Sequence, residues 1–439
     1  MNGNKNGNHK PHKLKFLFVS FEAETGDIAW QIKKEGHEVK FATVSASGNE
    51  EVYNGFIDKV KNWKEWVDWS DVIVFDDVDF GVEADKLRKK GKLVVGGSVY
   101  TDKLEMDRDF GQEELKKYGV AILPSWNFSN YDEALKFIKD NPGRYVFKPS
   151  GGVMSINKDL LFIGEEENGN DLLEILGQNK EVWQKKAPAF ILQKFVAGVE
   201  VAVGAFFNGK DFILPINVNF EYKRLFPGDI GPFTGDMGSL MFWSDTNYLF
   251  RETLEKMLSS LRESGYIGYI DINCIVNGRG IYPLEFTSRF GYPTIHTQLE
   301  GILQPASEWL YMLARGESFN LRIKRGFQIG VEIYVPSMLS RDKESVEIYQ
   351  DLPIFFKKHD NLDSIHIQDV KIEHGVWRIA GESGALLVVT GSGTTVEEAR
   401  RQVYLRIENI LTQNMFYRTD IGSDWKTNGD KLHTWGYII

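Results

Sequence analysis

The chain has 439 residues, of which 42% are hydrophobic and 26% are charged. This length predicts two to four domains, because a single core stops growing beyond roughly 250–300 residues. The formal net charge of −10 argues against a nucleic-acid-binding protein, which typically has a basic surface. A local basic cleft for a nucleotide is still compatible with this charge.

Cys274 is the single cysteine, so no disulfide can form within the chain, and a reducing, cytoplasmic environment is expected. The apolar residues around Cys274 predict a buried structural thiol. No apolar run reaches the length of about 18 residues that indicates a membrane helix, so we expect no membrane association. Residues 1–13 are rich in Asn, Gly, Lys and His, which predicts a disordered tail rather than a signal peptide.

The first hundred residues predict strands that alternate with helices. A helix is predicted over residues 26–36, and strands are predicted over residues 14–20, 39–44, 71–75 and 93–95. This order predicts an open parallel sheet, whose ligands bind at the carboxyl ends of the strands.

The loops at that edge are acidic. The loop of residues 20–26 has one glycine with Glu22 and Glu24, which is a poor composition for binding phosphate. The run Asp76, Asp77, Val78 and Asp79 follows the third strand. Two interpretations of this run stay open: a solvated loop, or an acidic pocket for an amine substrate.

The segment of residues 266–292 predicts a β-hairpin, because two apolar runs flank an Asn-Gly-Arg-Gly turn. Pairing of the two strands would bring the carboxylates of Asp271 and Glu285 together. Glu285, Thr287 and Arg289 alternate and should share one face. Hard oxygen ligands beside a guanidinium suit Mg²⁺ and a triphosphate. The alternative is a hairpin with a charged, solvated face.

Two further segments are rich in glycine. Residues 144–152 predict a strand that runs through Lys148 into Gly151 and Gly152. Residues 228–238 contain four glycines together with Pro232 and Thr234, a composition that exposes backbone donors in a shaped loop.

Together these segments resemble the ATP-grasp superfamily, and most closely the phosphoribosylamine–glycine ligase family. Residues 285–291, Glu-Phe-Thr-Ser-Arg-Phe-Gly, are similar to the family's Glu-Phe-Asn-x-Arg-Phe-Gly. Residues 222–239 are similar to its His-Lys-Arg followed by Asp-x-Gly-Pro-Asn-Thr-Gly-Gly-Met-Gly, and the Tyr-Arg-x-Asp-Ile-Gly of residues 417–422 is shared. Three residues depart from the pattern: Thr287 replaces Asn, Tyr292 replaces Asp and Thr294 replaces Glu.

The resemblance implies an α/β multidomain protein with the ATP-grasp fold. The expected parts are an N-terminal open-sheet domain over residues 14–100, an ATP-grasp domain over 101–326 with a lid near 118–190, and a small C-terminal α+β domain over 327–439.

The resemblance also implies roles for individual residues. The expected ligands of Mg²⁺ or Mn²⁺ are Asp271, Glu285 and Thr287. The groups expected to hold the amino-acid carboxylate and its acyl phosphate are Asp229, Thr234, Gly235 and Arg289. The expected ATP contacts are Arg108, Lys148, Gly151, Gly152, Gln193, Lys194, Phe195, Val196 and Glu200, with the backbone of residues 194–196 pairing with adenine. His296, near this segment, is interpreted as a structural histidine rather than a base.

The implied function is an ADP-forming carboxylate–amine ligase, acting as a monomer or homodimer on small molecules, with glycine as the expected carboxylate substrate. The acidic first loops favour an amine acceptor other than phosphoribosylamine. Phosphoribosylamine itself, the acceptor of purine biosynthesis, is the alternative. An alternative from another class is a nucleotide-binding protein that has lost turnover.

Overall fold

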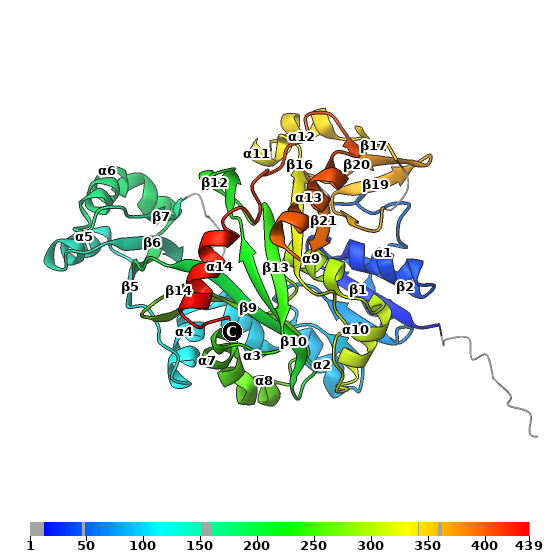
Figure 1. Ribbon diagram of the computed structural model, residues 1–439, viewed down its shortest axis with the longest axis horizontal. Helices are drawn as coiled ribbons and strands as arrows, with labels where there is room; N and C mark the ends of the chain where they lie inside the picture. Colours follow the sequence, from blue (N-terminus) through cyan, green and yellow to red (C-terminus); the bar gives the residue numbers. More distant parts are fainter. Residues whose placement is uncertain (1–12, 46–48, 151–159, 341, 359–361, 439) are drawn as a thin grey trace, which may run out of the picture.

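A computed structural model describes residues 13–45, 49–150, 160–340, 342–358 and 362–438. The predicted tail therefore lies outside the described residues, apart from Lys13, as do Gly151 and Gly152. Figure 1 shows a large body from which one lobe projects at the left.

The N-terminal part is the predicted parallel sheet, in the order β2-β1-β3-β4. Its strands are β1 (Lys15–Ser20), β2 (Glu38–Thr43), β3 (Val72–Phe75) and β4 (Leu93–Val95). The connecting helices are α1 (Gly26–Lys34), the 3₁₀ turn η1 (Trp63–Trp66) and α2 (Gly81–Lys89). Phe16, Leu17, Phe18 and Val19 are fully buried, which explains why β1 is apolar without alternation: both faces of a parallel sheet are covered.

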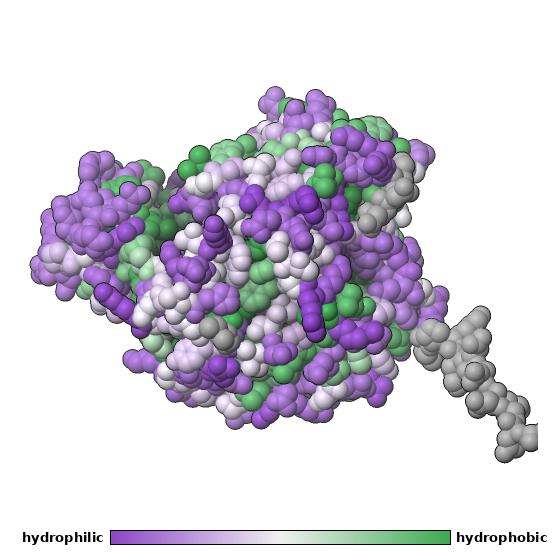
Figure 2. All heavy atoms as spheres, in the orientation of Figure 1, coloured by the Kyte–Doolittle hydropathy of each residue, from purple (hydrophilic) through white to green (hydrophobic). Residues whose placement is uncertain are grey.

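The projecting lobe has its own sheet, in the order β5-β8-β6-β7. Its strands and helices are β5 (Ser125–Phe128), α5 (Tyr131–Asp140), β6 (Tyr145–Ser150), β7 (Phe162–Ile163), α6 (Asn170–Lys186) and β8 (Ala189–Lys194). A separate core centred on Phe147, Phe190 and Leu172 holds it together. Figure 2 shows hydrophobic residues where this lobe meets the body, while its outer side is hydrophilic. The lobe is connected to the N-terminal sheet through α3 (Val99–Met106) and α4 (Arg108–Lys117).

An eight-stranded sheet forms the centre of the body, in the order β15-β14-β9-β10-β13-β16-β21-β18. Its strands are β9 (Val199–Phe207), β10 (Phe212–Glu221), β13 (Gly238–Ser244), β14 (Gly268–Asn277), β15 (Gly280–Thr287), β16 (Phe327–Tyr334), β18 (Ile365–Ile367) and β21 (Ala385–Gly393). The helices around it are α7 (Tyr248–Glu252), η4 (Leu254–Met257), α8 (Leu258–Ser264), α9 (Thr294–Gly301), α10 (Ala306–Ala314), α13 (Val396–Ile407) and α14 (Trp425–Thr434). Since β16 and β21 extend this sheet, hydrogen bonding continues across the predicted boundary at residue 327.

Two smaller groups of strands complete the chain. The hairpin β11 (Arg224–Phe226) and β12 (Ile230–Phe233) carries the glycine-rich loop. The other group is β17 (Pro353–Phe356), β19 (Val370–Glu373), β20 (Val376–Ile379) and β22 (Ile410–Leu411), with α11 (Ser337–Ser340) and α12 (Lys343–Tyr349) before it. The division of the chain into domains stays a prediction.

Candidate active site

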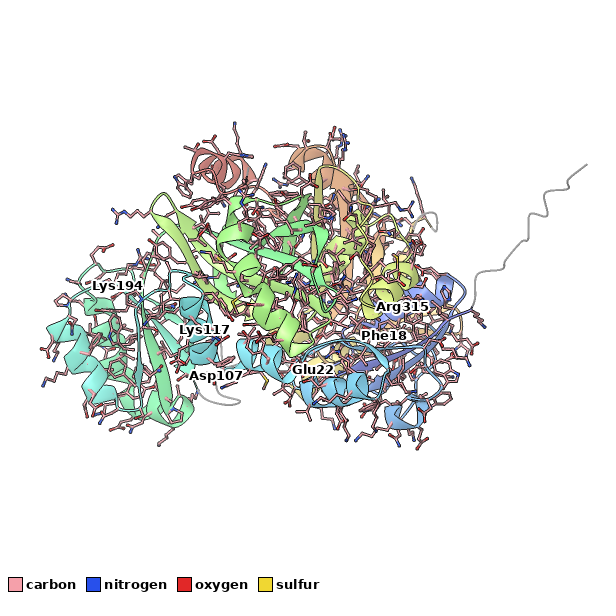
Figure 3. All side chains as sticks on the ribbon, turned by 90° about the horizontal axis from the view of Figure 1, so that it is seen from below. Phe18, Glu22, Asp107, Lys117, Lys194 and Arg315 are labelled. Carbon is pink, nitrogen blue, oxygen red and sulfur yellow. The ribbon has the colours of Figure 1, made fainter. Side chains whose placement is uncertain are left out.

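Two cavities meet at the loop that follows β12, and both are lined by Phe233 and Thr234. We call them the basic cavity and the acidic cavity. Figure 3 labels Lys194 of the projecting lobe, which lines the basic cavity, and Glu22 after β1, which lines the acidic cavity.

The basic cavity brings most of the predicted nucleotide residues together. It lies between the sheet of the lobe and the central sheet. Among the residues that line it are Arg108, Lys148, Gln193, Lys194, Phe195, Val196, Glu200, Lys223, Thr234 and Glu285. Four of these are cations and two are carboxylates, a surplus of positive charge that suits a polyphosphate.

Lys148 is one of the cations that line this cavity. Its Nζ donates a hydrogen bond to Gln193 Oε1 at 2.7 Å. Burial, with Arg108 nearby, lowers the pKa of Lys148 to about 8. Gln193 is neutral, so this hydrogen bond orients the ammonium of Lys148 without neutralising its charge.

This pKa predicts that ATP binding weakens with rising pH. Only the charged lysine attracts phosphate, so affinity should be near its maximum at pH 7 and should fall as the pH passes about 8. Binding should also take up protons near pH 8, which calorimetry in buffers of different ionisation enthalpy measures. Lys148→Ala should weaken ATP binding by about 1.5–3 kcal/mol, the range for a lost charged hydrogen bond.

Lys148→Arg is the matched control, since its guanidinium stays protonated through this range. It should bind ATP with little pH dependence. Equal pH profiles for the wild type and Lys148→Arg would assign the titration to another group.

In the segment predicted to pair with adenine, residues 194–196, two backbone N–H groups already donate hydrogen bonds within the protein. The backbone N–H of Lys194 donates to Pro124 O, and that of Phe195 donates to Arg144 O. The Arg144 guanidinium lies 3.5 Å from the centre of the Phe195 ring. An adenine edge here therefore has to use other backbone groups of the segment, such as those of Val196.

Lys223 also lines the basic cavity, although the sequence gave it no individual role. Its Nζ lies 2.9 Å from Glu200, 3.0 Å from Glu221 and 3.7 Å from Glu285. Burial lowers the pKa of Lys223, but these three carboxylates outweigh that effect and raise it well above its ordinary value. Arg108 contributes a second cation, 3.1 Å from Glu285. The signal in the sequence was the Lys-Arg pair at the start of the glycine-rich segment.

The predicted metal ligands share one face of the β14–β15 pair. Asp271 lies opposite Thr287, and Asn273 lies opposite Glu285, so the two carboxylates are diagonal neighbours rather than direct partners. Burial, with Glu221 nearby, raises the pKa of Asp271 to about 8. A bound cation beside Asp271 would offset both the burial and the repulsion from Glu221, and would favour the charged carboxylate.

Within the described residues there is no cluster of three or more His, Cys, Asp or Glu side chains arranged to hold a metal ion. Mg²⁺ bound with a nucleotide needs only one or two protein carboxylates, because phosphates and water supply its other ligands. The residues present therefore fit a nucleotide-bound Mg²⁺, and the assignment of Asp271, Glu285 and Thr287 as its ligands stays a prediction.

Arg289 faces a different part of the site from the one expected. Strand β15 ends at Thr287, and the backbone N–H of Ser288 donates to Glu105. Arg289 then lies 3.3 Å from both Asp77 and Glu105. The expected common face of Glu285, Thr287 and Arg289 is thus wrong for Arg289, because the alternation stops where the strand ends.

Asp76 and Asp77, in the acidic run after β3, form neither a solvated loop nor a pocket for an amine. Asp76 is fully buried and accepts hydrogen bonds from the backbone N–H groups of Phe21 and Thr25 and from Thr25 Oγ1. Asp77 pairs with Arg289. None of Asp76, Asp77 and Asp79 is among the described residues that line the acidic cavity. Asp76 and Asp77 anchor loops instead, whereas Asp79 is exposed to solvent.

In the glycine-rich loop, Thr234 and Gly235 line the acidic cavity. The N–H and hydroxyl of Thr234 both donate to Lys223 O, at 2.7 and 2.9 Å, so the hydroxyl holds the loop against the short connection between β10 and β11 that contains Lys223. Gly231 has φ of 86°, and a Cβ there would lie 2.7 Å from the Phe226 ring, so only glycine fits the turn.

Asp229, by contrast, is turned away from both cavities. Its Oδ1 accepts from Arg418 Nη1 at 2.9 Å, and its side chain is 70% exposed. Arg418 is 1% exposed and also binds Asp420 and Arg224 O. The terminal Arg-x-Asp thus clamps the glycine-rich hairpin, and the placement points to loop positioning rather than catalysis for Asp229.

His296 is fully buried in α9, and its ring centre lies 5.2 Å from that of His366. Burial, with His366 nearby, lowers the pKa of His296 to about 3. It lines neither cavity. Cys274 is buried as well, as expected.

The sequence is similar to those of known enzymes. Residues 106–295 match the family described as phosphoribosylglycinamide synthetase, ATP-grasp (A) domain. The phosphoribosylamine–glycine ligase of Thermotoga maritima is 26% identical over 404 residues, which cover 90% of this chain and 95% of the relative.

Solved structures agree with this fold. The crystal structure of the Thermotoga maritima enzyme has a TM-score of 0.70 at 22% identity and covers 93% of this chain and 100% of its own. The biotin carboxylase domain of Hydrogenobacter thermophilus 2-oxoglutarate carboxylase, in complex with MgADP, has a TM-score of 0.63 at 14% identity, covering 97% and 96%.

The chain is a member of the ATP-grasp superfamily, which confirms the predicted α/β fold and class of ligase. Within that superfamily it is similar to phosphoribosylamine–glycine ligases, as the resemblance predicted. Among the helices of the described part of the chain, none combines the length and the apolar character that crossing a lipid bilayer demands.

Proposed function

We propose that the protein uses ATP to join an amino-acid carboxylate, with glycine as the substrate of choice, to an amine. The observation that carries this proposal is the meeting of a basic and an acidic cavity at one glycine-rich loop. A nucleotide in the first cavity would direct its terminal phosphate toward the loop, and an amine in the second would approach from the other side.

The reaction has two steps. A carboxylate oxygen attacks the γ-phosphorus of ATP and ADP leaves, which gives an acyl phosphate. The amine nitrogen then attacks the acyl carbon, the bond from that carbon to the phosphate oxygen breaks, and the departing phosphate takes the proton from nitrogen. Positioning and charge neutralisation supply most of such catalysis, and here Arg108, Lys148 and Lys223 provide the positive charge.

Mg²⁺, when bound, would neutralise phosphate charge beside Glu285 and Asp271. The protein's own groups hold the two substrates in line and shield the acyl phosphate from water. Lys223 keeps Glu200, Glu221 and Glu285 together, which fixes the wall between the phosphates and the loop.

Trapping with hydroxylamine tests the first step without any knowledge of the acceptor. With glycine, ATP and Mg²⁺, the wild-type protein should form glycine hydroxamate and ADP in equal amounts. A panel of other amino acids identifies the preferred carboxylate. Absence of hydroxamate and ADP with every amino acid would favour a nucleotide-binding protein without turnover.

We expect Glu285→Gln and Asp271→Asn to lower this activity about 100-fold or more at limiting Mg²⁺. Each removes a carboxylate from the face proposed to hold the metal. Glu308→Gln, on α10 and lining neither cavity, is the matched control and should behave as wild type. A Glu285→Gln enzyme with wild-type turnover at limiting Mg²⁺ would remove Glu285 from the metal site.

The known relatives favour phosphoribosylamine as the acceptor, and this is the second candidate for the amine. The composition of the acidic cavity favours a different one.

A further inference from the structure

The acidic cavity has a volume of about 790 Å³, which is within the range of about 300–1,000 Å³ found for small-molecule sites. Parts of the chain far apart in sequence form it. They include the segment after β1 with Tyr53, the loop of residues 232–236, Tyr292, the end of β16 with α11, and residues 368–385.

The described ionisable side chains that can give this cavity a charge at neutral pH are all acidic. The carboxylate residues in its lining are Glu22, Glu24, Asp236, Glu332, Asp369 and Glu382. No lysine, arginine or histidine is found among the described residues of that lining. The basic cavity on the other side of Thr234 has four cations, so the two substrates would enter fields of opposite sign.

Some of these carboxylates are held by the protein. Asp236 accepts from the backbone N–H groups of Tyr222, Met237 and Gly238. Asp369 accepts from Ser383. Glu24 is half-buried and has no side-chain hydrogen bond or ion pair with any described residue, so its carboxyl group is available to a ligand. Burial, with Asp76, Asp369 and Glu332 nearby, raises the pKa of Glu24 well above its ordinary value, and a bound ammonium would favour its charged form.

A second, independent observation comes from Gln368. It is 8% exposed and lines the cavity. Its Nε2 donates to Glu332 Oε1 at 3.1 Å, while its Oε1 has no hydrogen-bond partner among the described residues. A buried carbonyl oxygen without a donor costs free energy. A ligand that brings N–H groups would satisfy it.

These features define the ligand's chemistry. Carboxylates and an unpaired carbonyl oxygen are acceptors, so the ligand must be rich in donors and positively charged. A phosphosugar brings a dianion that no cation in the described lining would balance. A simple monoamine would leave most of the cavity's charge unmatched.

We infer that the acceptor is a diamine or polyamine, with one ammonium held between Glu24 and the Gln368–Glu332 pair while a second, neutral amine reaches the acyl phosphate at Thr234. The inference rests on the proposed function, since it names the second substrate of that reaction. One nitrogen stays charged and binds, and the other loses its proton and attacks. The product is an amide between glycine and the amine, with phosphate released.

The test compares 1,4-diaminobutane with butylamine, its matched monoamine, and with phosphoribosylamine generated in place. The full-length protein is given glycine, ATP and Mg²⁺, and the amide is measured by mass spectrometry. We expect kcat/KM for the diamine to exceed that for butylamine about tenfold or more, as one added charged contact implies. Equal use of the two amines, or efficient use of phosphoribosylamine, would overturn the inference.

Calorimetric binding of the same two amines gives a readout that does not depend on turnover. If hydroxylamine trapping fails but the diamine still binds more tightly than butylamine, the proposed function is wrong and the acidic site stands. If trapping succeeds but the two amines bind equally, the proposed function stands and the inferred diamine site is wrong.

Glu24→Gln and Gln368→Leu probe the site directly. Each should narrow the preference for the diamine over the monoamine to below about threefold, because Glu24→Gln removes the carboxylate charge and Gln368→Leu removes the carbonyl acceptor for the anchored ammonium. Glu308→Gln should keep the full preference. An unchanged preference in both cavity variants would place the amine elsewhere.

Discussion

Replacing Lys223 by methionine should lower glycine-dependent ADP formation by about 100-fold to 1,000-fold. Methionine keeps much of the side chain's length and removes its charge. Glu200, Glu221 and Glu285, which now lie within 3.7 Å of the ammonium, would then repel one another and the incoming triphosphate. The measurement is steady-state ADP release with glycine at saturating ATP and Mg²⁺.

The same substitution should also destabilise the fold by about 1–3 kcal/mol, the cost of leaving charged groups without partners. Lys223→Arg keeps the charge and should recover part of the activity. Lys256→Met is the matched control, because Lys256 pairs with Glu252 at 2.7 Å but lines neither cavity. If Lys223→Met and Lys256→Met lose equal activity, Lys223 has no special place in the reaction.

Replacing Arg418 by alanine should release the glycine-rich hairpin from the end of the chain. Arg418 is almost completely buried and connects Asp229, Asp420 and the carbonyl of Arg224. Its loss should cost about 1–3 kcal/mol of folding free energy, because Arg224 O and the partly buried Asp420 lose charged hydrogen bonds. The KM for the carboxylate substrate should rise, since the loop proposed to hold this substrate loses its support.

Asp229→Asn distinguishes positioning from catalysis. Asp229 is 70% exposed, and an exposed ion pair contributes up to about 1 kcal/mol, so this substitution should lower activity less than about fivefold. Arg400→Ala removes a neighbouring contact, from Arg400 to Thr419 O at 3.2 Å, and should have little effect. A loss of activity in Asp229→Asn as large as that in Arg418→Ala would restore the catalytic role first expected for Asp229.

Local patterns in the sequence were sufficient for several features of the fold and the site. The alternation of apolar strands and helices predicted the parallel sheet of β1 to β4, because an apolar strand and its crossover helix form within a short stretch of chain. The strand pair with Asp271 and Glu285 followed from two apolar runs around a turn. The expectation that Lys148 contacts ATP followed from its place in a predicted strand that leads into two glycines.

Roles that depend on distant contacts were assigned only by the tertiary structure. Arg418 and Asp229 are 189 positions apart, and Arg108 and Glu285 are 177 positions apart. Nothing in the residues near Asp229 shows that its partner is the terminal arginine. Alternation predicted Arg289 on the face of Glu285, but the strand ends first and Asp77 binds the guanidinium.

The acidic cavity shows the same division between sequence and structure. The sequence by itself determined that Glu22 and Glu24 follow β1 at the ligand edge of the sheet. It did not predict that Glu332, Asp369 and Glu382 would join them, or that Asp76 would be buried beneath the loop. Charge along a chain is a local property, whereas the electrostatic field in a cavity sums over every segment that folding brings to its wall.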